Sequence, residues 1–312
     1  MQEFTILELD TPFNTMIDKN TIAEAFKTLQ DNICSSLEKE DGHGFFKEDI
    51  WTRPGGGGGR SRILESNVIE KGGVNFSAVA GELPQNIVTA LKVADNQFFA
   101  TGVSIVIHPK NPFVPIIHMN IRYFELSDGT YWFGGGIDLT PHYIIEEDAT
   151  FFHNELKRVC NTHNNTYYPK FKKWADDYFF IKHRNETRGI GGIFFDRLNE
   201  TSEEKSKNEI FEFVLNIGQL FAPTYIALVA KNKNKTYTDQ QKNWQYIRRS
   251  RYVEFNLVYD KGTKFGLDTD GRIESILMSM PPEARWPYQF TPEKNSAEEK
   301  TLKLLKKDIN WA

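Results

Sequence analysis

Cysteine is scarce in this sequence, with only two residues, Cys34 and Cys160, among 312. The two lie far apart and in no spacing typical of metal ligands or of a redox pair. This distribution rules against an iron–sulfur cluster and favours a reducing compartment. We therefore expect a cytoplasmic protein.

Long apolar runs are also missing. No segment approaches the roughly 20 apolar residues that a membrane span requires, so we expect no integral membrane association. Residues 1–14 carry acidic side chains and no apolar core behind positive charge, so neither a signal peptide nor an organelle presequence is expected.

An excess of positive charge is absent as well. The 38 Lys and Arg residues face 42 Asp and Glu residues, and the net charge is −4, which gives no general attraction to nucleic acid or anionic membranes. The basic run 248–251 belongs to no wider basic stripe, and the aromatic residues lack the spacing of an RNA-binding sheet. We exclude nucleic acid as a partner and expect any anionic ligand to be held by a local group of basic side chains.

The composition predicts one folded domain over residues 1–312, because 39% of the residues are hydrophobic and no internal repeat or linker divides the chain. Apolar residues at helical spacing over 20–40 predict an N-terminal helical segment within 1–40. Extended segments come in pairs at 62–82 and 99–126, as in an antiparallel sheet. Further expected elements are helices after Pro141, over 170–183, from a capping box at 201–204 to 220 and over 238–248, and strands over 251–259 and 272–279. The pattern indicates an α+β fold, a mostly antiparallel sheet covered by helices.

The segment 118–138 predicts a β-hairpin with polar side chains on one face. Alternation places His118, Asn120 and Arg122 on one side of the first strand. A two-residue turn at Asp128-Gly129 would put Asp138 on the opposite face, whereas a three-residue loop or a bulge within residues 134–136 would bring it to the face of the triplet. We favour the second register.

The glycine run 55–59 does not fit a phosphate-binding loop, because it lacks the lysine-serine/threonine ending and no apolar strand precedes it. It predicts either a flexible surface loop or a mobile lid. In a lid, the flanking Arg53, Arg60 and Arg62 could clamp carboxylates. Farther along the chain, residues 265–272 predict a turn that presents Arg272, or simply a polar hairpin tip.

Four histidines invite a metal hypothesis: His108, His118, His153 and His183. Their spacing is not diagnostic and there is no HExxH motif, so separate surface or core roles are the simpler interpretation. His118 also suits general acid–base catalysis, because imidazole titrates near neutral pH.

Several long blocks of the chain resemble oxygen-dependent coproporphyrinogen-III oxidases. The blocks are WTRPGGGGGRSRILESNVIEKGGVNFS at 51–77, GVSIVIHPKNPFVP at 102–115, HMNIRYFE at 118–125, WFGGGIDLTP at 132–141, FFIKHRNETRGIGGIFFD at 179–196, RRSRYVEFNLVYDKGTKFGL from 248, and GRIESILMSMPP ending at 282. The resemblance covers almost all of the chain beyond the first forty residues.

The resemblance implies a homodimer with residues 252–287 at the interface, and a sheet flanked by helices on both faces. It implies conversion of two propionates of coproporphyrinogen III to vinyl groups, giving protoporphyrinogen IX, with molecular oxygen as co-substrate and no organic cofactor. Bacterial members are described with a divalent metal at positions matching the four histidines above, whereas other members are treated as metal-free. A metal ligand and a free proton donor are competing roles for His118.

Residue roles are implied in the same way. Arg122 would hold the reacting propionate, Asp138 would hydrogen-bond the pyrrole N–H groups, and His118 matches a proton donor. Arg60 or Arg62 could add contacts from the lid. The positions that match substrate contacts are Ser104, Asn120, Ile121, Arg122, Asp270, Gly271 and Arg272. His142 departs from the hydrophobic or aromatic residue expected after DLTP.

Two other functions stay open on the sequence. A non-catalytic tetrapyrrole carrier would keep the pocket without the reaction, although Arg122 and Asp138 are both present. A metal-dependent oxygenase acting on another substrate would lose its activity on chelation.

Overall fold

A seven-stranded antiparallel sheet organises the part of the chain that the computed structural model describes, residues 16–83, 85, 88, 89, 96–268 and 271–312. The strand order is β1-β2-β3-β4-β5-β6-β9, so neighbours in the sheet are also neighbours in sequence up to β6. The strands are β1 (Lys47–Thr52), β2 (Gly57–Leu64), β3 (Ile69–Glu82), β4 (Gln97–Pro109), β5 (Ile116–Leu126), β6 (Tyr131–Thr140) and β9 (Gly191–Leu198). The predicted α+β fold with an antiparallel sheet is confirmed.

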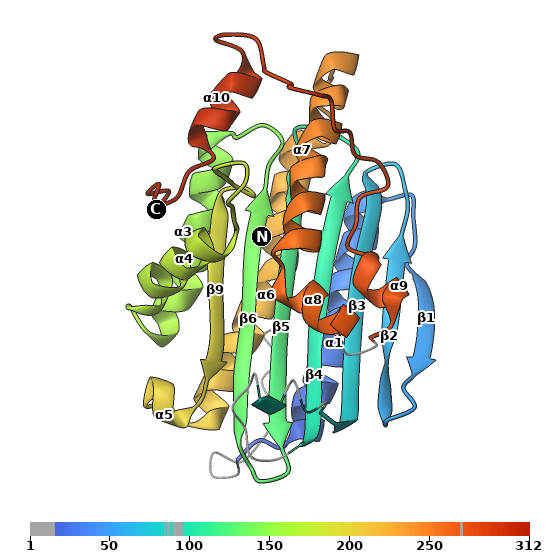
Figure 1. The fold of residues 1–312 in the computed structure, drawn as a ribbon, viewed down its shortest axis with the longest axis vertical. Helices are drawn as coiled ribbons and strands as arrows, with labels where there is room; N and C mark the ends of the chain where they lie inside the picture. The colour runs from blue at the N-terminus through green and yellow to red at the C-terminus, as the bar shows by residue number, and fades with distance from the viewer. Residues whose placement is uncertain (1–15, 84, 86–87, 90–95, 269–270) are drawn as a thin grey trace.

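Helices cover both faces of this sheet (Figure 1). In this view α1 and α6 lie behind the strands, α7, α8 and α9 lie in front, and α3 and α4 lie beside β9. The helices are α1 (Lys19–Asp41), α3 (Glu146–His163), α4 (Tyr167–Tyr178), α5 (Glu200–Glu203), α6 (Lys207–Asn232), α7 (Asp239–Val258), α8 (Lys261–Asp268), α9 (Ile273–Leu277) and α10 (Ala297–Leu304). A separate two-stranded hairpin, β7 (Phe180–Ile181) with β8 (Glu186–Thr187), follows α4.

The main core lies between the sheet and the helix pair α1 and α6. Every second residue of β5 points to this side, and three of them are fully buried: Met119, Ile121 and Tyr123. Gly218 on α6 permits a close approach, because an added Cβ would lie 2.8 Å from Cδ1 of Ile121. The predicted N-terminal helix is α1, which begins after the N-cap Asp18, while residues 1–15 lie outside the described part of the chain. We call the face of the sheet that α1 and α6 cover the core face, and the opposite face the site face.

Helix α6 corrects the expectation that no segment is long and apolar enough to cross a membrane. Its 26 residues have a mean hydropathy of 1.6 over the best window, but 67% of that window is buried inside the protein. Helix α6 packs against β5, β6, α1 and α3. Its position as a core helix accounts for its apolar sequence.

The strands predicted over 251–259 and 272–279 are wrong, because these residues belong to α7 and to α9 with the turn that follows it. Helix α7 begins with a capping box between Thr238 and Gln241 and continues to Val258. The capping box predicted at 201–204 is also misplaced: the long helix is capped by Ser206 and Glu209, after the single turn α5. The helix predicted over 170–183 ends at Tyr178, where the β7–β8 hairpin begins.

The glycine run is partly strand, since Gly58 and Gly59 pair with both β1 and β3 and Gly57 pairs with β3. The side chains of Arg60 and Arg62 point toward α1, where both pair with Asp31. They therefore lie on the core face rather than over Arg122, so this structure does not place them in a lid.

Candidate active site

The β5–β6 hairpin has the register that brings Asp138 to the same face as the polar triplet. Leu126 pairs with Thr130 around a three-residue loop, with Gly129 at a φ of +87°. His118 consequently lies directly opposite Asp138, and Asn120 opposite Gly136. The predicted register is confirmed, and the loop rather than a bulge produces it.

A row of polar side chains crosses the site face perpendicular to the strands. The pairing places Asp49, Ser61, Asn75, Ser104 and Asn120 side by side on successive strands from β1 to β5. Because neighbouring strands are about 4.8 Å apart, Ser61 and Asn120 are separated by about 14 Å. Ser104, Asn75 and Asn120 are partly exposed, whereas the intervening core-face residues are buried. Ser61, by contrast, is 1% exposed and lies 2.9 Å from the hydroxyl of Ser275 on α9. The accessible part of the row, from Asn75 to Asn120, is suited to a flat ligand.

Beside this row, His118 and Asp138 form a hydrogen-bonded pair. The His118 Nδ1 lies 2.8 Å from the Asp138 Oδ1, and the side chains are 21% and 1% exposed. The pairing with a carboxylate assigns the Nδ1 proton to the hydrogen bond and leaves Nε2 available for proton transfer.

Arg188 completes this site and was missed by the sequence analysis. Its Nη2 donates to Oδ1 and Oδ2 of Asp138 at 2.7 and 2.8 Å, and its Nη1 donates to Oδ1 of Asn256 at 2.7 Å. The guanidinium is 4.3 Å from the ring centroid of Phe179 and 4.7 Å from that of Phe255. Because α7 supplies Asn256 and Phe255, only the tertiary fold assembles this cage.

The electrostatic balance at Asp138 favours the carboxylate. Burial by itself would raise the pKa of Asp138, but the Arg188 guanidinium and the His118 hydrogen bond together hold this pKa below its usual value of 3.8. Conversely, burial would lower the pKa of Arg188, yet the Asp138 carboxylate raises it. A fixed negative charge therefore lies beneath His118 at neutral pH.

Arg122 is held at the other side of Asn120. Its Nη1 donates to Oδ1 of Asn120 at 2.9 Å, and its Nη2 donates to Oδ1 of Asp196 on β9 at 2.8 Å. The guanidinium crosses β6 at Gly134, where an added Cβ would lie 2.5 Å from Oδ1 of Asp196 and 2.8 Å from Cζ of Arg122. A side chain at position 134 would thus displace this ion pair.

Arg272 lies at the far end of the polar row. It forms an ion pair with Asp49 and lies 3.1 Å from the hydroxyl of Ser275, at the start of α9. Gly271 donates its N–H to the Gly266 carbonyl, while Asp270 lies outside the described residues. The side chain of Ile121 is buried on the core face, so only its backbone faces the row.

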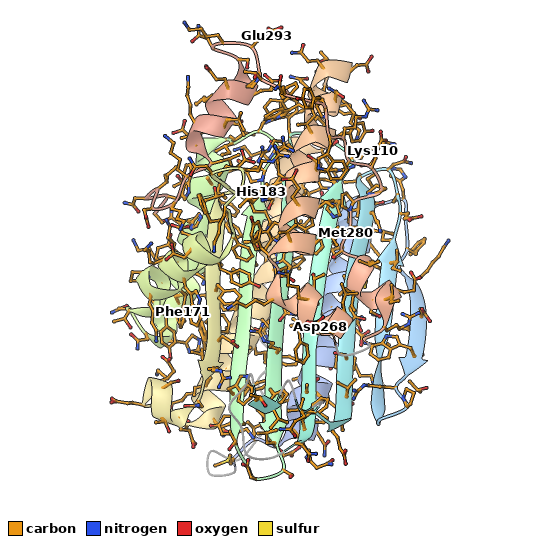
Figure 2. The ribbon with its side chains drawn as sticks, viewed as in Figure 1. Lys110, Phe171, His183, Asp268, Met280 and Glu293 are labelled. Carbon is orange, nitrogen blue, oxygen red and sulfur yellow. The ribbon has the colours of Figure 1, made fainter. Side chains whose placement is uncertain are left out.

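The four histidines of the metal hypothesis are not brought together. His108 is buried with Nε2 2.8 Å from the Ser279 carbonyl, and His153 is buried with its two ring nitrogens near the hydroxyl of Tyr168 and the Ile190 carbonyl. His183, labelled in Figure 2, lies in the β7–β8 turn against Glu254. No three His, Cys, Asp or Glu side chains gather as a potential metal site anywhere in the described ranges. These residues do not fit a single shared ion.

His142, which replaces the hydrophobic or aromatic residue expected after DLTP, is buried with its Nδ1 3.3 Å from the Pro112 carbonyl.

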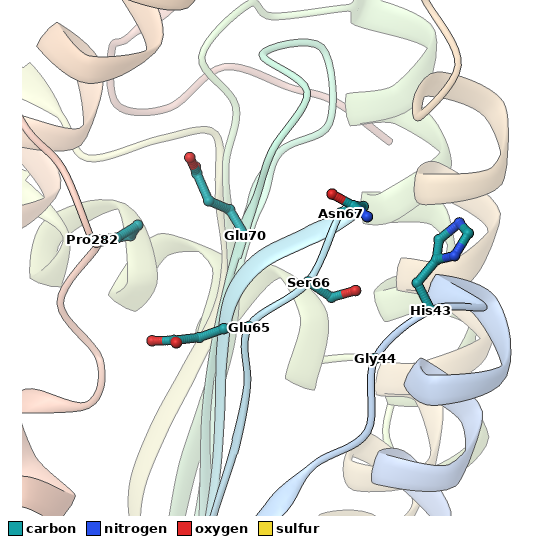
Figure 3. Close-up of a pocket in the computed structure, with 7 residues that line it drawn as sticks. All are labelled: His43, Gly44, Glu65, Ser66, Asn67, Glu70 and Pro282. Atoms are coloured by element: carbon teal, nitrogen blue, oxygen red, sulfur yellow. The ribbon is translucent and has the colours of Figure 1, made fainter.

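An open depression of about 640 Å³ lies elsewhere, where the loop after α1 meets the β2–β3 connection (Figure 3). Its lining residues are His43, Gly44, Glu65, Ser66, Asn67, Glu70 and Pro282. None of the predicted site residues borders it, and Glu70 is engaged by Arg249. We therefore place the candidate site on the polar row.

Comparisons with known proteins identify the family of this chain. The family model described as coproporphyrinogen III oxidase matches residues 21–311. An oxygen-dependent coproporphyrinogen-III oxidase of Drosophila melanogaster is 50% identical over 298 residues, 91% of this chain and 75% of its own length. Its counterpart in Prochlorococcus marinus (strain MIT 9312) is 48% identical over 308 residues, 91% of this chain and 90% of its own length, and the chloroplastic coproporphyrinogen-III oxidase 1 of Arabidopsis thaliana is 46% identical over 328 residues, 99% and 84%. This chain belongs to the coproporphyrinogen III oxidase family.

Proposed function

We propose that this protein is an oxygen-dependent coproporphyrinogen-III oxidase that converts two propionates of coproporphyrinogen III to vinyl groups, giving protoporphyrinogen IX in haem biosynthesis. The observation that carries this proposal is the arrangement of Arg122 and Arg272. These guanidiniums lie at opposite ends of the neutral side chains of the polar row, Ser61, Asn75, Ser104 and Asn120. Such spacing suits a wide ligand with carboxylates at its rim.

Binding uses both ends of the row. Arg122 would take the propionate that reacts, because it lies on the same strand as His118, and Arg272, at the opposite end of the row, would take a propionate on the other side of the ring. Ser104 and Asn120, with the Asn75 that lies between Ser104 and Ser61, offer neutral hydrogen-bond partners beneath the macrocycle. Held in this way, the flexible substrate presents one side chain at a time to the proton-transfer group.

His118 would move the protons of the reaction. Asp138 is too enclosed to serve a bulky substrate directly, because its side chain is 1% exposed and both of its oxygens accept from Arg188. We therefore assign Asp138 mainly a positioning role: its hydrogen bond fixes the tautomer and the ring orientation of His118. A hydrogen bond from a pyrrole N–H to Asp138 would need the substrate to reach into the strand layer.

The chemistry requires oxygen and no organic cofactor. Each propionate side chain, CH2–CH2–COO⁻, gives a vinyl group, carbon dioxide, one proton and two electrons. One O2 takes up these two electrons and two protons to become hydrogen peroxide. The electron-rich porphyrinogen can supply the electrons itself, so the chain's own task is to orient the substrate, exclude water and transfer protons.

We further propose a homodimer through residues 252–287. Exposed apolar side chains concentrate in this stretch, on the end of α7 and on α8 and α9: Leu257, Val258, Phe265, Leu267, Ile273 and Leu277, each 36% to 59% exposed. Exposed apolar side chains gathered in one stretch support a protein–protein contact, and in a homodimer the same surface would meet its own copy. Light scattering coupled to size exclusion measures the mass directly, and a mass of one chain at micromolar concentration would contradict it.

A cytoplasmic location is the accompanying proposal. Cys34 and Cys160 are free and buried, which supports a protein that works in a reducing compartment. Fractionation of cells that express the chain tests this location.

The decisive experiment incubates the purified protein with coproporphyrinogen III, with and without oxygen and with and without a chelator. Chromatography of the oxidised porphyrins follows the loss of carboxyl groups. Protoporphyrin that forms only with oxygen supports the proposal, and tight binding without decarboxylation would indicate a carrier instead. Loss of activity on chelation would indicate that the reaction depends on a metal ion. No step proposed above uses a metal.

A further inference from the structure

Both substrate-facing arginines are already paired with an aspartate of the same chain. Arg122 binds Asp196, and Arg272 binds Asp49. The four side chains are between 29% and 52% exposed, so either ion pair can open without unfolding its surroundings. The Arg188–Asp138 pair differs, because it is 2% and 1% exposed and cannot exchange with a ligand.

We propose that Asp196 and Asp49 are positioning residues that take the place of substrate propionates: each holds its arginine in the binding geometry and is displaced when a propionate arrives. This proposal rests on the proposed function and deepens it by naming groups that set the affinity for carboxylates. The reaction would remove the propionate at Arg122, and Asp196 would then pair with this arginine again.

The local structure supports exchange at Arg122. Nη1 remains on Asn120 while Nη2 carries the ion pair with Asp196, so the guanidinium keeps one fixed contact when its partner changes. Gly134 leaves the space through which the pair forms, since an added Cβ would lie 2.5 Å from the Asp196 Oδ1. A propionate that enters from the open face would meet an arginine already in place.

The energetic consequence is a limit on affinity. Binding a propionate replaces one exposed ion pair by another, so the net gain from each arginine is smaller than that of an unpaired guanidinium. An exposed ion pair contributes about 0.2 to 1 kcal/mol, which corresponds to roughly a 1.4-fold to fivefold change in affinity. Removal of the aspartate charge should therefore tighten carboxylate binding by a factor in this range.

The test measures binding of coproporphyrin III, the unreactive porphyrin with four propionates, and of its tetraamide, in which these groups are neutral. We expect Asp196→Asn to tighten the binding of coproporphyrin III by roughly 1.4-fold to fivefold and to leave the binding of the tetraamide unchanged. KM for coproporphyrinogen III should fall by the same factor. Asp49→Asn should tighten the binding of coproporphyrin III in the same way. Because the two ion pairs are several strands apart, the two fold-changes in affinity should multiply in the double variant.

Asp31→Asn is the matched control, because Asp31 pairs with Arg60 on the core face at a similar exposure, 46% for the aspartate. This variant should bind coproporphyrin III and its tetraamide with wild-type affinity. Weaker or unchanged coproporphyrin III binding in both aspartate variants would overturn the inference, and so would equal tightening of the tetraamide. An Asp196→Ala variant checks that residual hydrogen bonding by asparagine does not hide the effect. A wild-type protein without binding or turnover would refute the proposed function itself, whereas normal turnover with unchanged variants would refute this inference alone.

Discussion

Replacement of Arg188 by methionine tests the buried part of the site most directly. The substitution keeps an unbranched side chain within the ring cage but leaves the Asp138 carboxylate, 1% exposed, without its cationic partner. Breaking a buried ion pair on one side costs about 3 to 5 kcal/mol, because the remaining charge stays desolvated. With about 2.1 cal/mol/K of unfolding entropy per residue over 312 residues, the melting temperature should fall by about 5 to 8 °C.

The stability lost in Arg188→Met should depend on pH, and the pKa of Asp138 gives the direction of this dependence. In the wild-type protein the pKa of Asp138 is lowered on folding, so its contribution to stability is present above pH 3.8 and is lost as the pH falls through the folded pKa. In Arg188→Met, burial would instead raise this pKa. The folded variant then favours the protonated carboxyl. The loss of unfolding free energy relative to the wild-type protein should therefore be largest at about pH 8 and should shrink toward about pH 5.

Thermal unfolding across this pH range, together with Asp138→Asn and the double variant, measures the coupling. The double variant should regain part of the unfolding free energy that Arg188→Met loses, since it contains no unpaired buried carboxylate. A loss below about 1 kcal/mol, or a double variant no more stable than Arg188→Met, would refute the assignment of Asp138 as a buried carboxylate held by Arg188.

Three further predictions concern activity and assembly. His118→Gln should lower the rate of oxygen uptake about 10² to 10⁴-fold with little change in melting temperature; a rate within tenfold of wild type would contradict its role in proton transfer. Gly134→Ala should raise KM, because its Cβ would lie 2.8 Å from Cζ of Arg122 and push the guanidinium itself out of its binding position, and an unchanged KM in steady-state assays would argue against propionate binding by Arg122 at this position. Ile273→Asp, which places a charge on an apolar surface 59% exposed, should give monomers in light scattering, and a mass that stays dimeric would move the interface elsewhere.

The two wrongly predicted strands, 251–259 and 272–279, lie in the last third of the chain. Residues 252–258 are rich in aromatic and β-branched side chains, which favour strands on propensity, yet they complete α7. Tyr252 and Phe255 are three apart and both fully buried against the site face, so tertiary packing overrides the local preference. Arg188 was missed for a related reason: nothing in the sequence near position 188 indicates Asp138 or Asn256 as partners.

The sequence by itself determined the features that depend on local geometry. Alternation along β5 separates His118, Asn120 and Arg122 from the buried Met119 and its core-face neighbours, because side chains of a strand alternate strictly. The hairpin loop sets the register with β6, and the blocks of family motif indicated the chemistry. What only the tertiary structure decided are the contacts between distant segments: the cage of Arg188 by α7, the pairing of Arg122 with Asp196 across Gly134, and the separation of the four histidines. These depend on which helix covers which face of the sheet, and that choice is made by the packing of the whole core rather than by any local pattern.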